Sequence, residues 1–169
     1  SLPPPPDSKM YSSNMSAWRS TEAEFVAREL GINRFVSCQE EWNVLNRAIE
    51  KDVTPMMEAF GLGMLPFFPL ASGLLTGKYK RDAMPAGARL TDAPRFANRG
   101  YVSDANFDKV EKLEAYAKEQ GRSLLELAFG WLASQKVTAS VIAGATKPEQ
   151  IRSNVAAAGW KMTQADRDA

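Results

Sequence analysis

The chain has no histidine and only one cysteine, Cys38, among its 169 residues. The lack of histidine excludes histidine-based catalytic triads, histidine-ligated metal sites and the most common general acid–base side chain. A lone cysteine excludes an internal disulfide and is typical of proteins from a reducing compartment. Because no histidine is present to activate it, Cys38 is interpreted as a small buried apolar residue.

Strong net charge and long apolar runs are missing as well. Lysine and arginine number 21 against 20 aspartates and glutamates, which leaves a formal net charge of +1. This balance gives no general attraction to nucleic acid or to an anionic membrane surface. No apolar run is long enough to span a bilayer, and the proline-rich first residues do not read as a signal peptide. We therefore expect a cytoplasmic protein without a nucleic-acid or membrane partner.

What is present is the composition of an ordinary globular domain, with 44% hydrophobic and 24% charged residues. Residues 1–8 include four consecutive prolines and are expected to be an extended, disordered start. Residues 9–169 are sufficient for one domain with its own core.

Short apolar segments alternate with amphipathic ones along this domain. Strands are predicted at 9–12, 34–38, 64–68 and 140–143. Helices are predicted at 21–30, after Thr54, at 104–120, after Ser123 and after Thr146. Capping pairs that support these starts are Thr21 with Glu24, Ser123 with Glu126, and Thr146 with Glu149. Glycines that follow helix ends are Gly31, Gly61 and Gly121.

This alternation predicts βαβ units and a parallel sheet of the α/β class. Two architectures fit the pattern: a small open sheet, or a piece of a (β/α) barrel. In both, ligands bind at the carboxyl ends of the strands. A long loop over residues 72–103 is expected to be functional or mobile, because such loops are unusual in compact domains.

The residues after the predicted strands are amides, hydroxyls, aromatic rings and glycines. They lie at 13–14, 39–40, 67–73 and 144–147. Such groups can hydrogen-bond an amide, stack on a flat ring and offer backbone N–H groups to a phosphate. Each has an ordinary structural alternative: Asn14 as a turn residue, Phe67 and Phe68 as core, Thr146 as a helix cap. Together they favour a nucleotide site over a hydrolytic one.

From about Ser12 to Asn154 the sequence resembles the C-terminal half of an aldo-keto reductase, including the related potassium-channel beta subunits. The stretches that carry the resemblance are 13–18, 39–47, 69–79 and 142–154. The resemblance implies NADP(H) binding on a (β/α)₈ TIM barrel, of which this chain would supply strands five to eight with their helices. Residues 9–169 would then be the cofactor-binding half of the barrel.

Site residues follow from the resemblance, position by position. Ser13, Asn14 and Gln39 are expected to hydrogen-bond the nicotinamide carboxamide, and Phe67 to stack on the ring. The pyrophosphate would be lined by Phe68, Leu70, Ser72 and Lys78. The adenosine 2′-phosphate and adenine would be held by Thr146, Lys147, Gln150 and Asn154, with Arg89 closing over the cofactor.

The family's catalytic tyrosine, lysine, aspartate and histidine come from the first half of the barrel, which this chain does not match. Tyr11, Tyr79, Tyr101 and Tyr116 do not stand in the catalytic motif, so no catalytic residue is assigned. Because a half barrel leaves two sheet edges open, we expect self-association or a complementing N-terminal half.

Three functions remain open at this stage. The first is an NADP(H)-dependent reductase of aldehydes and ketones, with this chain as its cofactor-binding half. The second is a regulatory module that binds NADP(H) without turnover, and the third is an inactive truncated fragment. A carbonyl substrate is implied, but its identity is not readable from these residues.

Overall fold

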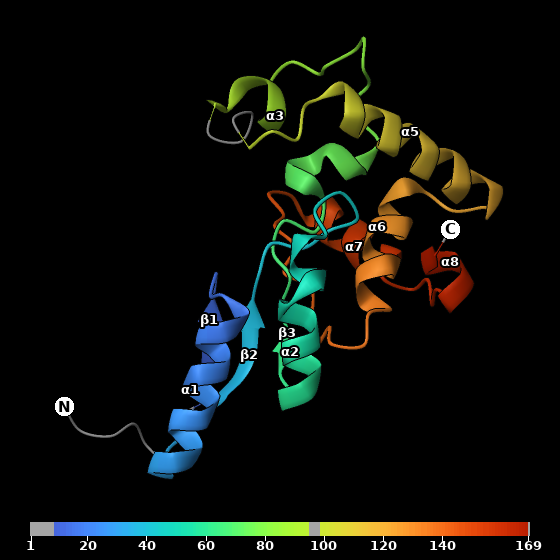
Figure 1. Cartoon of the computed structure of the whole chain (residues 1–169). Helices are drawn as coiled ribbons and strands as arrows, with labels where there is room; N and C mark the ends of the chain where they lie inside the picture. Colours follow the sequence, from blue (N-terminus) through green and yellow to red (C-terminus); the bar gives the residue numbers. More distant parts are fainter. Residues whose placement is uncertain (1–8, 95–98, 169) are drawn as a thin grey trace.

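A computed structural model of the chain describes residues 9–94 and 99–168. Its centre is a three-stranded parallel sheet in the order β1-β2-β3, formed by Met10–Ser13, Phe35–Gln39 and Gly63–Met64 (Figure 1). The predicted α/β class is therefore confirmed. The expected disordered start at residues 1–8 lies outside the described residues.

The first two strands pair closely, with Ser12 opposite Cys38 and Ser13 opposite Gln39. Cys38 is buried, as expected, and accepts a hydrogen bond from the Ser12 hydroxyl at 3.0 Å. Both strands end one residue beyond their predicted ends, which is within the usual uncertainty of element boundaries. The third strand is much shorter than the predicted 64–68.

The predicted fourth strand at 140–143 is not a strand in the structure. An extended segment runs there beside β3, and Thr138 makes a single parallel bridge with Met64. Met64 exchanges hydrogen bonds with Val137 O and Ala139 N at 2.7 and 2.9 Å. The next ladder bond would need an N–H from Pro66, which proline does not have. Pairing therefore loses its register, and the segment continues with one bond, from Ile142 N to Pro66 O at 3.0 Å.

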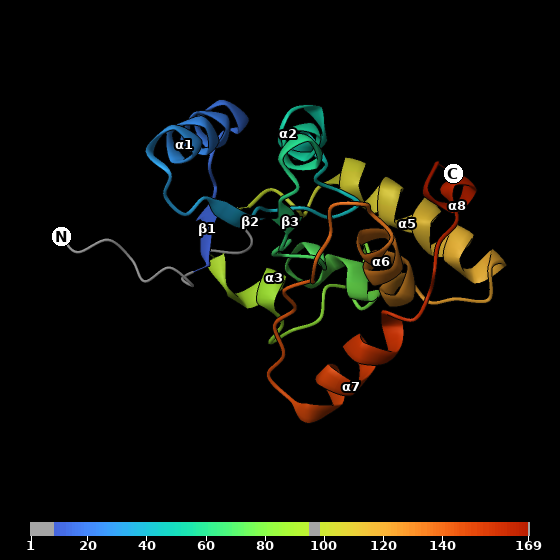
Figure 2. The same ribbon diagram turned by 90° about the horizontal axis from the view of Figure 1, so that it is seen from below.

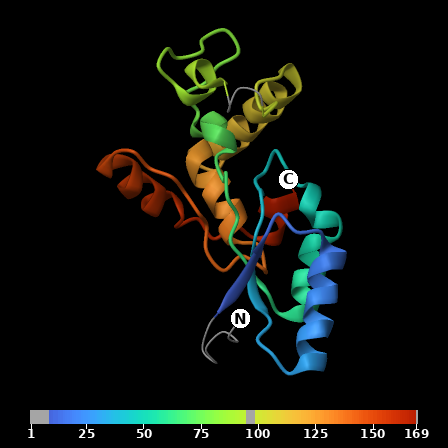
Figure 3. The ribbon, with the colours of Figure 1, turned by 90° about the vertical axis from the view of Figure 1, so that its left-hand side faces the viewer.

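The helices α1 (Ala17–Leu30) and α2 (Val53–Phe60) lie side by side on one face of the sheet (Figures 2 and 3). The N-caps expected at Thr21 and Thr54 are wrong, because both residues lie inside their helices and Ser16 and Asp52 precede the first helical residue. The expected ends are right: Gly31 and Gly61 both take the left-handed conformation that stops a helix. A 3₁₀ turn, η1 (Ala48–Lys51), leads into α2.

After residue 103, the described chain forms α5 (Asp104–Glu119), α6 (Leu124–Ala133), α7 (Pro148–Ala157) and α8 (Gln164–Asp168). The capping box between Ser123 and Glu126 forms as predicted, with the Glu126 carboxylate 2.9 Å from Ser123 N. Seven of the ten residues of α6 are buried, so this helix passes through the core. By contrast, α7 projects on the side opposite to α1 and α2 (Figure 3).

Two apolar clusters hold these elements together. One lies between the sheet and the helices α2 and α6, where the rings of Trp42 and Trp131 meet edge to face at 5.4 Å. The other lies beyond the carboxyl ends of the strands and contains Leu74, Leu75 and Tyr79. Burial of this kind is the main favourable contribution to folding.

The predicted long loop 72–103 is partly structured where the structure describes it. It begins inside η2 (Ala71–Thr76) and contains the short helix α3 (Arg89–Asp92), both beyond the carboxyl ends of the strands (Figure 1). Arg81 pairs with Asp104 and Asp108 of α5, and Lys80 pairs with Glu114. These ion pairs fasten the first part of the loop along α5.

Apolar side chains remain exposed on the outer parts of this arrangement. Tyr11 on the free edge of β1 is 60% exposed, and Trp18 and Phe25 on α1 are 63% and 58% exposed. Among the described residues, every helix is too short or too polar to cross a lipid bilayer.

Candidate functional site

Three of the predicted site residues meet where β1 and β2 end. Ser13 and Gln39 are register partners in a parallel pair, so their side chains point to the same face of the sheet. Asn14 donates its backbone N–H to Gln39 O at 3.1 Å and its side-chain amide to Ser13 Oγ at 3.1 Å. Asn14 has φ 52°, a left-handed conformation that non-glycine residues rarely adopt. Ser13 and Asn14 are exposed, so their polar groups are available to a ligand.

Phe67 is brought to the same edge by the next segment of the chain. Its N–H donates to Glu40 O at 3.0 Å, and it forms a parallel bridge with Glu41. The rings of Phe67 and Phe68 meet edge to face at 5.5 Å, and both side chains are half-buried. Amides and hydroxyls therefore lie next to an aromatic pair at the ends of three adjacent strands.

The turn that follows has an unusual backbone. Phe68, Ala71 and Ser72 have φ values of 52°, 48° and 59°, and Gly73 has φ 106°. The N–H groups of Ala71 and Gly73 are used within the turn, where they donate to Phe68 O at 3.0 Å and to Leu70 O at 2.7 Å. Ser72 is 3% exposed, and its hydroxyl has no hydrogen-bond partner within the part of the chain that the structure describes. A buried hydroxyl without a partner is costly unless a ligand satisfies it. Leu70, half-buried, belongs to the same turn.

Lys78 lies beside this turn. Its Nζ is 4.9 Å from the centre of the Tyr79 ring, and its Cε would lie 3.8 Å from a Cβ placed on Gly73. Lys78 as a residue is exposed. Tyr79 Oη accepts a hydrogen bond from Leu90 N at 3.1 Å, which ties α3 to the same place. Arg89, the exposed first residue of α3, is therefore on a segment anchored next to the turn.

The last group of predicted residues lies at the start of α7. Gln150 Oε1 accepts hydrogen bonds from Thr146 N at 2.7 Å, Thr146 Oγ1 at 3.2 Å and Lys147 N at 3.2 Å. Gln150, and not the predicted Glu149, thus closes the helix start, because the N-cap is Lys147 and the third helical position after it is Gln150. Thr146 and Lys147 are exposed, as is Gln150.

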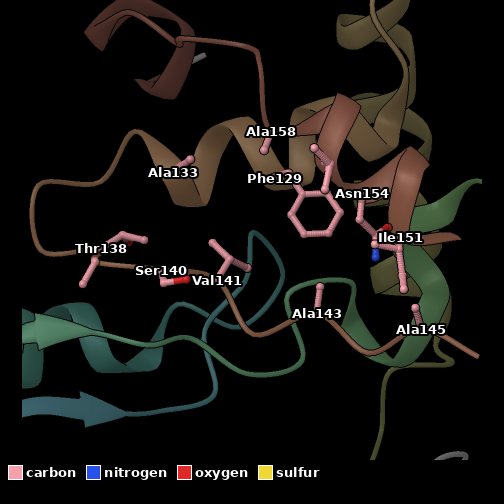
Figure 4. Close-up of a pocket in the computed structure, with 12 residues that line it drawn as sticks. Phe129, Ala133, Thr138, Ser140, Val141, Ala143, Ala145, Ile151, Asn154 and Ala158 are labelled. Atoms are coloured by element: carbon pink, nitrogen blue, oxygen red, sulfur yellow. The ribbon is translucent and has the colours of Figure 1, made fainter. Parts of the chain in front are cut away.

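Asn154, unlike the predicted residues at 146, 147 and 150, lines a groove of about 410 Å³ between the 138–145 segment, α6 and α7 (Figure 4). Most of the groove wall is apolar, with Phe129, Val141, Ile151 and Val155 among its residues. The chemistry of this groove suits apolar packing and not phosphate binding.

A buried polar cluster that the sequence did not reveal supports the aromatic pair from behind. Asn43 is fully buried and donates to Phe68 O and Tyr101 Oη, both at 3.0 Å. The Tyr101 hydroxyl donates to the Glu41 carboxylate, which also pairs with Arg99. The Arg99 guanidinium lies 4.2 Å from the centre of the Phe68 ring. Burial, followed by the bond to Glu41, raises the pKa of Tyr101, so its hydroxyl stays protonated.

These residues were missed because Glu41 and Tyr101 are 60 positions apart in the sequence. The available signal was the pair of acidic residues directly after a buried strand, since a carboxylate there needs a partner. Three of the four tyrosine hydroxyls are engaged in structural bonds: Tyr79 with Leu90, Tyr101 with Glu41, and Tyr116 with Asp166.

The model of the Aldo/keto reductase family matches residues 12–168. A probable voltage-gated potassium channel subunit beta of Oryza sativa subsp. japonica is 41% identical over 148 residues, covering 86% of this chain and 45% of the relative. An NADH-specific methylglyoxal reductase of Escherichia coli (strain K12) is 30% identical, covering 87% of this chain and 44% of the relative.

A third relative is an L-glyceraldehyde 3-phosphate reductase of Escherichia coli O157:H7, which is 32% identical over 123 residues. That match covers 70% of this chain and 35% of the relative. The chain thus spans less than half the length of the relatives it matches.

Proposed function

The chain belongs to the aldo/keto reductase family, and on that premise we propose that it is the NADP(H)-binding part of a carbonyl reductase. In this proposal the three strands and the 138–142 segment are strands five to eight of a (β/α)₈ barrel. The substrates are aldehydes or ketones. When bound, a nicotinamide cofactor supplies the hydride that reduces such a carbonyl.

The observation that carries the proposal is the convergence at the strand ends. Ser13, Asn14 and Gln39 lie beside Phe67 there, and the left-handed turn at 71–73, which contains the buried Ser72 hydroxyl, follows directly. A carboxamide, a flat ring and a phosphate are the chemical groups that such an arrangement accepts. The unpaired Ser72 hydroxyl fits the same reading, because a pyrophosphate oxygen would give it a partner.

Each group of residues has a distinct task in this proposal. Ser13, Asn14 and Gln39 bind the carboxamide and so fix which face of the ring is presented, while Phe67 stacks on the other face. Ser72 and Lys78, with Phe68 and Leu70, line the pyrophosphate, and Arg89 closes over it from α3. The acid that protonates the carbonyl oxygen is expected from the half of the barrel that this chain does not match.

The preference for NADP(H) rests on the start of α7. Thr146 and Lys147 place a hydroxyl and a cation at a helix N-terminus, where an additional phosphate is stabilised. Gln150 and Asn154 are proposed to contact the adenosine end. One relative is named as NADH-specific, so the choice between the cofactors must be tested on this chain.

The test is a fluorescence titration of the purified chain with NADPH and with NADH, together with its mass in solution. Saturable NADPH binding is expected. Lys147→Ala should weaken NADPH roughly tenfold, the loss of one charge-assisted hydrogen bond, and NADH less than twofold. Lys161→Ala, an exposed lysine beyond the other end of α7, is the matched control. If neither nucleotide binds, the proposed function fails; equal loss of both with Lys147→Ala removes the NADP(H) preference.

The exposed edge of β1, where Tyr11 is 60% exposed, supports a further part of the proposal. An open strand edge with apolar neighbours pairs readily with another strand. We propose that a complementing N-terminal half, or a second copy of the chain, covers it in solution. A monomeric mass at micromolar concentration, unchanged by a complementing half, would contradict this.

A second candidate function is a regulatory subunit that binds NADP(H) without turnover. It is favoured by one observation, the 41% identity to a probable potassium channel subunit beta. Measuring aldehyde reduction after complementation separates the two: binding without NADPH oxidation supports the regulatory function.

A further inference from the structure

Glu40 is a buried carboxylate at the centre of the proposed nicotinamide site. It directly follows Gln39 and is 7% exposed. Across residues 9–94 and 99–168, no ion pair to Glu40 is present. Burial raises the pKa of its carboxyl, while backbone N–H groups of Met15 and Asn14 oppose that shift. Burying a carboxylate without a cation is unfavourable, so the hydrogen bonds that Glu40 accepts must offset that cost.

Glu40 connects all three segments that bear the nicotinamide contacts. Its side-chain Oε1 accepts a hydrogen bond from Met15 N at 3.0 Å, directly after Ser13 and Asn14. Its backbone oxygen accepts the Phe67 N–H at 3.0 Å. The side chain shares the helix-facing side of β2 with Cys38, since Gln39 between them points the other way. Glu40 therefore acts from behind the strand ends.

The backbone conformation of Asn14 explains why the bond to Met15 matters. With φ 52°, Asn14 is in the left-handed conformation, which asparagine adopts more readily than most residues but which still needs local bonds to be the single conformation of the turn. Two bonds hold it there: its own N–H to Gln39 O on one side, and Met15 N to the Glu40 carboxylate on the other. Without the second bond the turn can relax, and the amide of Asn14 and the hydroxyl of Ser13 lose their common direction.

We propose that Glu40 is a positioning residue that fixes the Ser13–Asn14 turn for the nicotinamide carboxamide. This rests on the proposed function. Glu40 does not touch the ligand; its effect is confined to the nicotinamide end, because the turn at 71–73 and the start of α7 make no bond to it.

The experiment compares two ligands that share the adenosine and phosphate parts. One is NADPH; the other is 2′-phosphoadenosine diphosphate ribose, which lacks the nicotinamide. Glu40→Ala and Glu40→Met remove the acceptor, and methionine also fills the space, so that folding is retained. Both variants should weaken NADPH roughly five- to twentyfold and the second ligand less than twofold, because a buried donor is left unpaired. Glu40→Gln keeps an acceptor oxygen and should stay within threefold of the original chain for NADPH.

Glu58→Gln is the control for the loss of one negative charge. Glu58 pairs with Lys136 near the end of α2, away from the strand ends. An equal loss for both ligands in the alanine and methionine variants would mean that Glu40 serves general stability, and would overturn the inference. So would a glutamine variant as weak as the alanine variant. If the original chain binds the second ligand but not NADPH, the inference fails while the phosphate site stands. If it binds neither ligand, the proposed function fails and the inference with it.

Discussion

The two ends of the proposed cofactor site are built in opposite ways. The strand-end region, residues 13–15, 39–43 and 67–68, rests on buried groups: Glu40 is 7% exposed and Asn43 is fully buried. The α7-start region, residues 144–150, consists of exposed residues held by the bonds to Gln150 Oε1. One end is therefore set in place by the core, while the other depends on a surface hydrogen-bond cluster.

This difference has a consequence for binding. The strand-end region keeps its arrangement without a ligand, so little ordering is required when one arrives. At the α7-start region, Gln150 already occupies the N–H groups of Thr146 and Lys147. A phosphate that binds there must replace Gln150 as the acceptor of these N–H groups. Its affinity therefore depends on how much more strongly it accepts these hydrogen bonds than Gln150 does. In the proposed site, the strand ends would fix the geometry of the nicotinamide, and the start of α7 would set the preference between NADP(H) and NAD(H).

The largest expected effect comes from removing a buried hydrogen-bonding side chain of the strand-end region. Asn43→Ala removes the side chain that donates to Phe68 O and Tyr101 Oη and accepts from Leu45 N and Asn46 N. We expect the free energy of unfolding to fall by about 3 kcal/mol, because several buried groups lose partners. Urea unfolding measures this. The control is Asn46→Ala, whose side chain has one weak contact, to Ala48 N at 3.5 Å. Equal losses in the two variants would show that the strand-end region is no more tightly built than its surroundings.

A smaller effect is expected from changing Gln150, which competes with a phosphate for the N–H groups at the start of α7. Gln150→Glu keeps the acceptor oxygen and adds a negative charge near the helix N-terminus. The helix should become more stable by about 0.5 kcal/mol, because an anion there is favourable. NADPH should nevertheless bind roughly tenfold more weakly, because the new carboxylate repels its 2′-phosphate. NADH, which lacks the 2′-phosphate, is the control ligand, and we expect its dissociation constant to be the same for Gln150→Glu and the original chain. NADPH binding that is unaffected would place the 2′-phosphate elsewhere.

The smallest expected effect is a change with pH in the stability that Glu40 contributes to the strand-end region. Burial raises the pKa of Glu40 in the folded state, so folding favours its protonated form. Its contribution to stability is present below the unfolded-state pKa and is lost as the pH rises through the folded-state pKa. Glu40→Gln should therefore gain in melting temperature relative to the original chain by about 2 °C between pH 4 and pH 7. Glu22→Gln, an exposed position on α1, provides the control. A melting-temperature difference between Glu40→Gln and the original chain that stays constant from pH 4 to pH 7 would contradict a raised pKa at Glu40.

Features that depend on near neighbours were predictable from the sequence. Gly31 and Gly61 end their helices, and Ser123 caps α6 with Glu126, because all the partners lie within one helical turn. The rule that ligands bind at the carboxyl ends of parallel strands predicted that Ser13, Asn14, Gln39 and Phe67 lie at one edge of the sheet, where the structure has them; that they bind a ligand stays a prediction.

What the sequence did not reveal depends on contacts between distant segments. The 140–143 segment is as apolar as a strand, but its pairing fails at Pro66, more than seventy positions earlier. The support of the aromatic pair by Arg99 and Tyr101 is equally non-local. At α7 the prediction was wrong by one residue: Lys147 and not Thr146 is the N-cap, so the third helical position is Gln150 and not Glu149.

The bonds of the strand-end region also differ in when they can form. The Glu40–Met15 bond joins residues 25 positions apart and comes with the pairing of β1 and β2. The Asn43–Tyr101 bond closes a loop of 58 positions. Longer loops cost more entropy to close and form more slowly. During folding, the Ser13–Asn14 turn is therefore set early, and Phe68 gains its final support only after the chain through Tyr101 has been synthesised and docked.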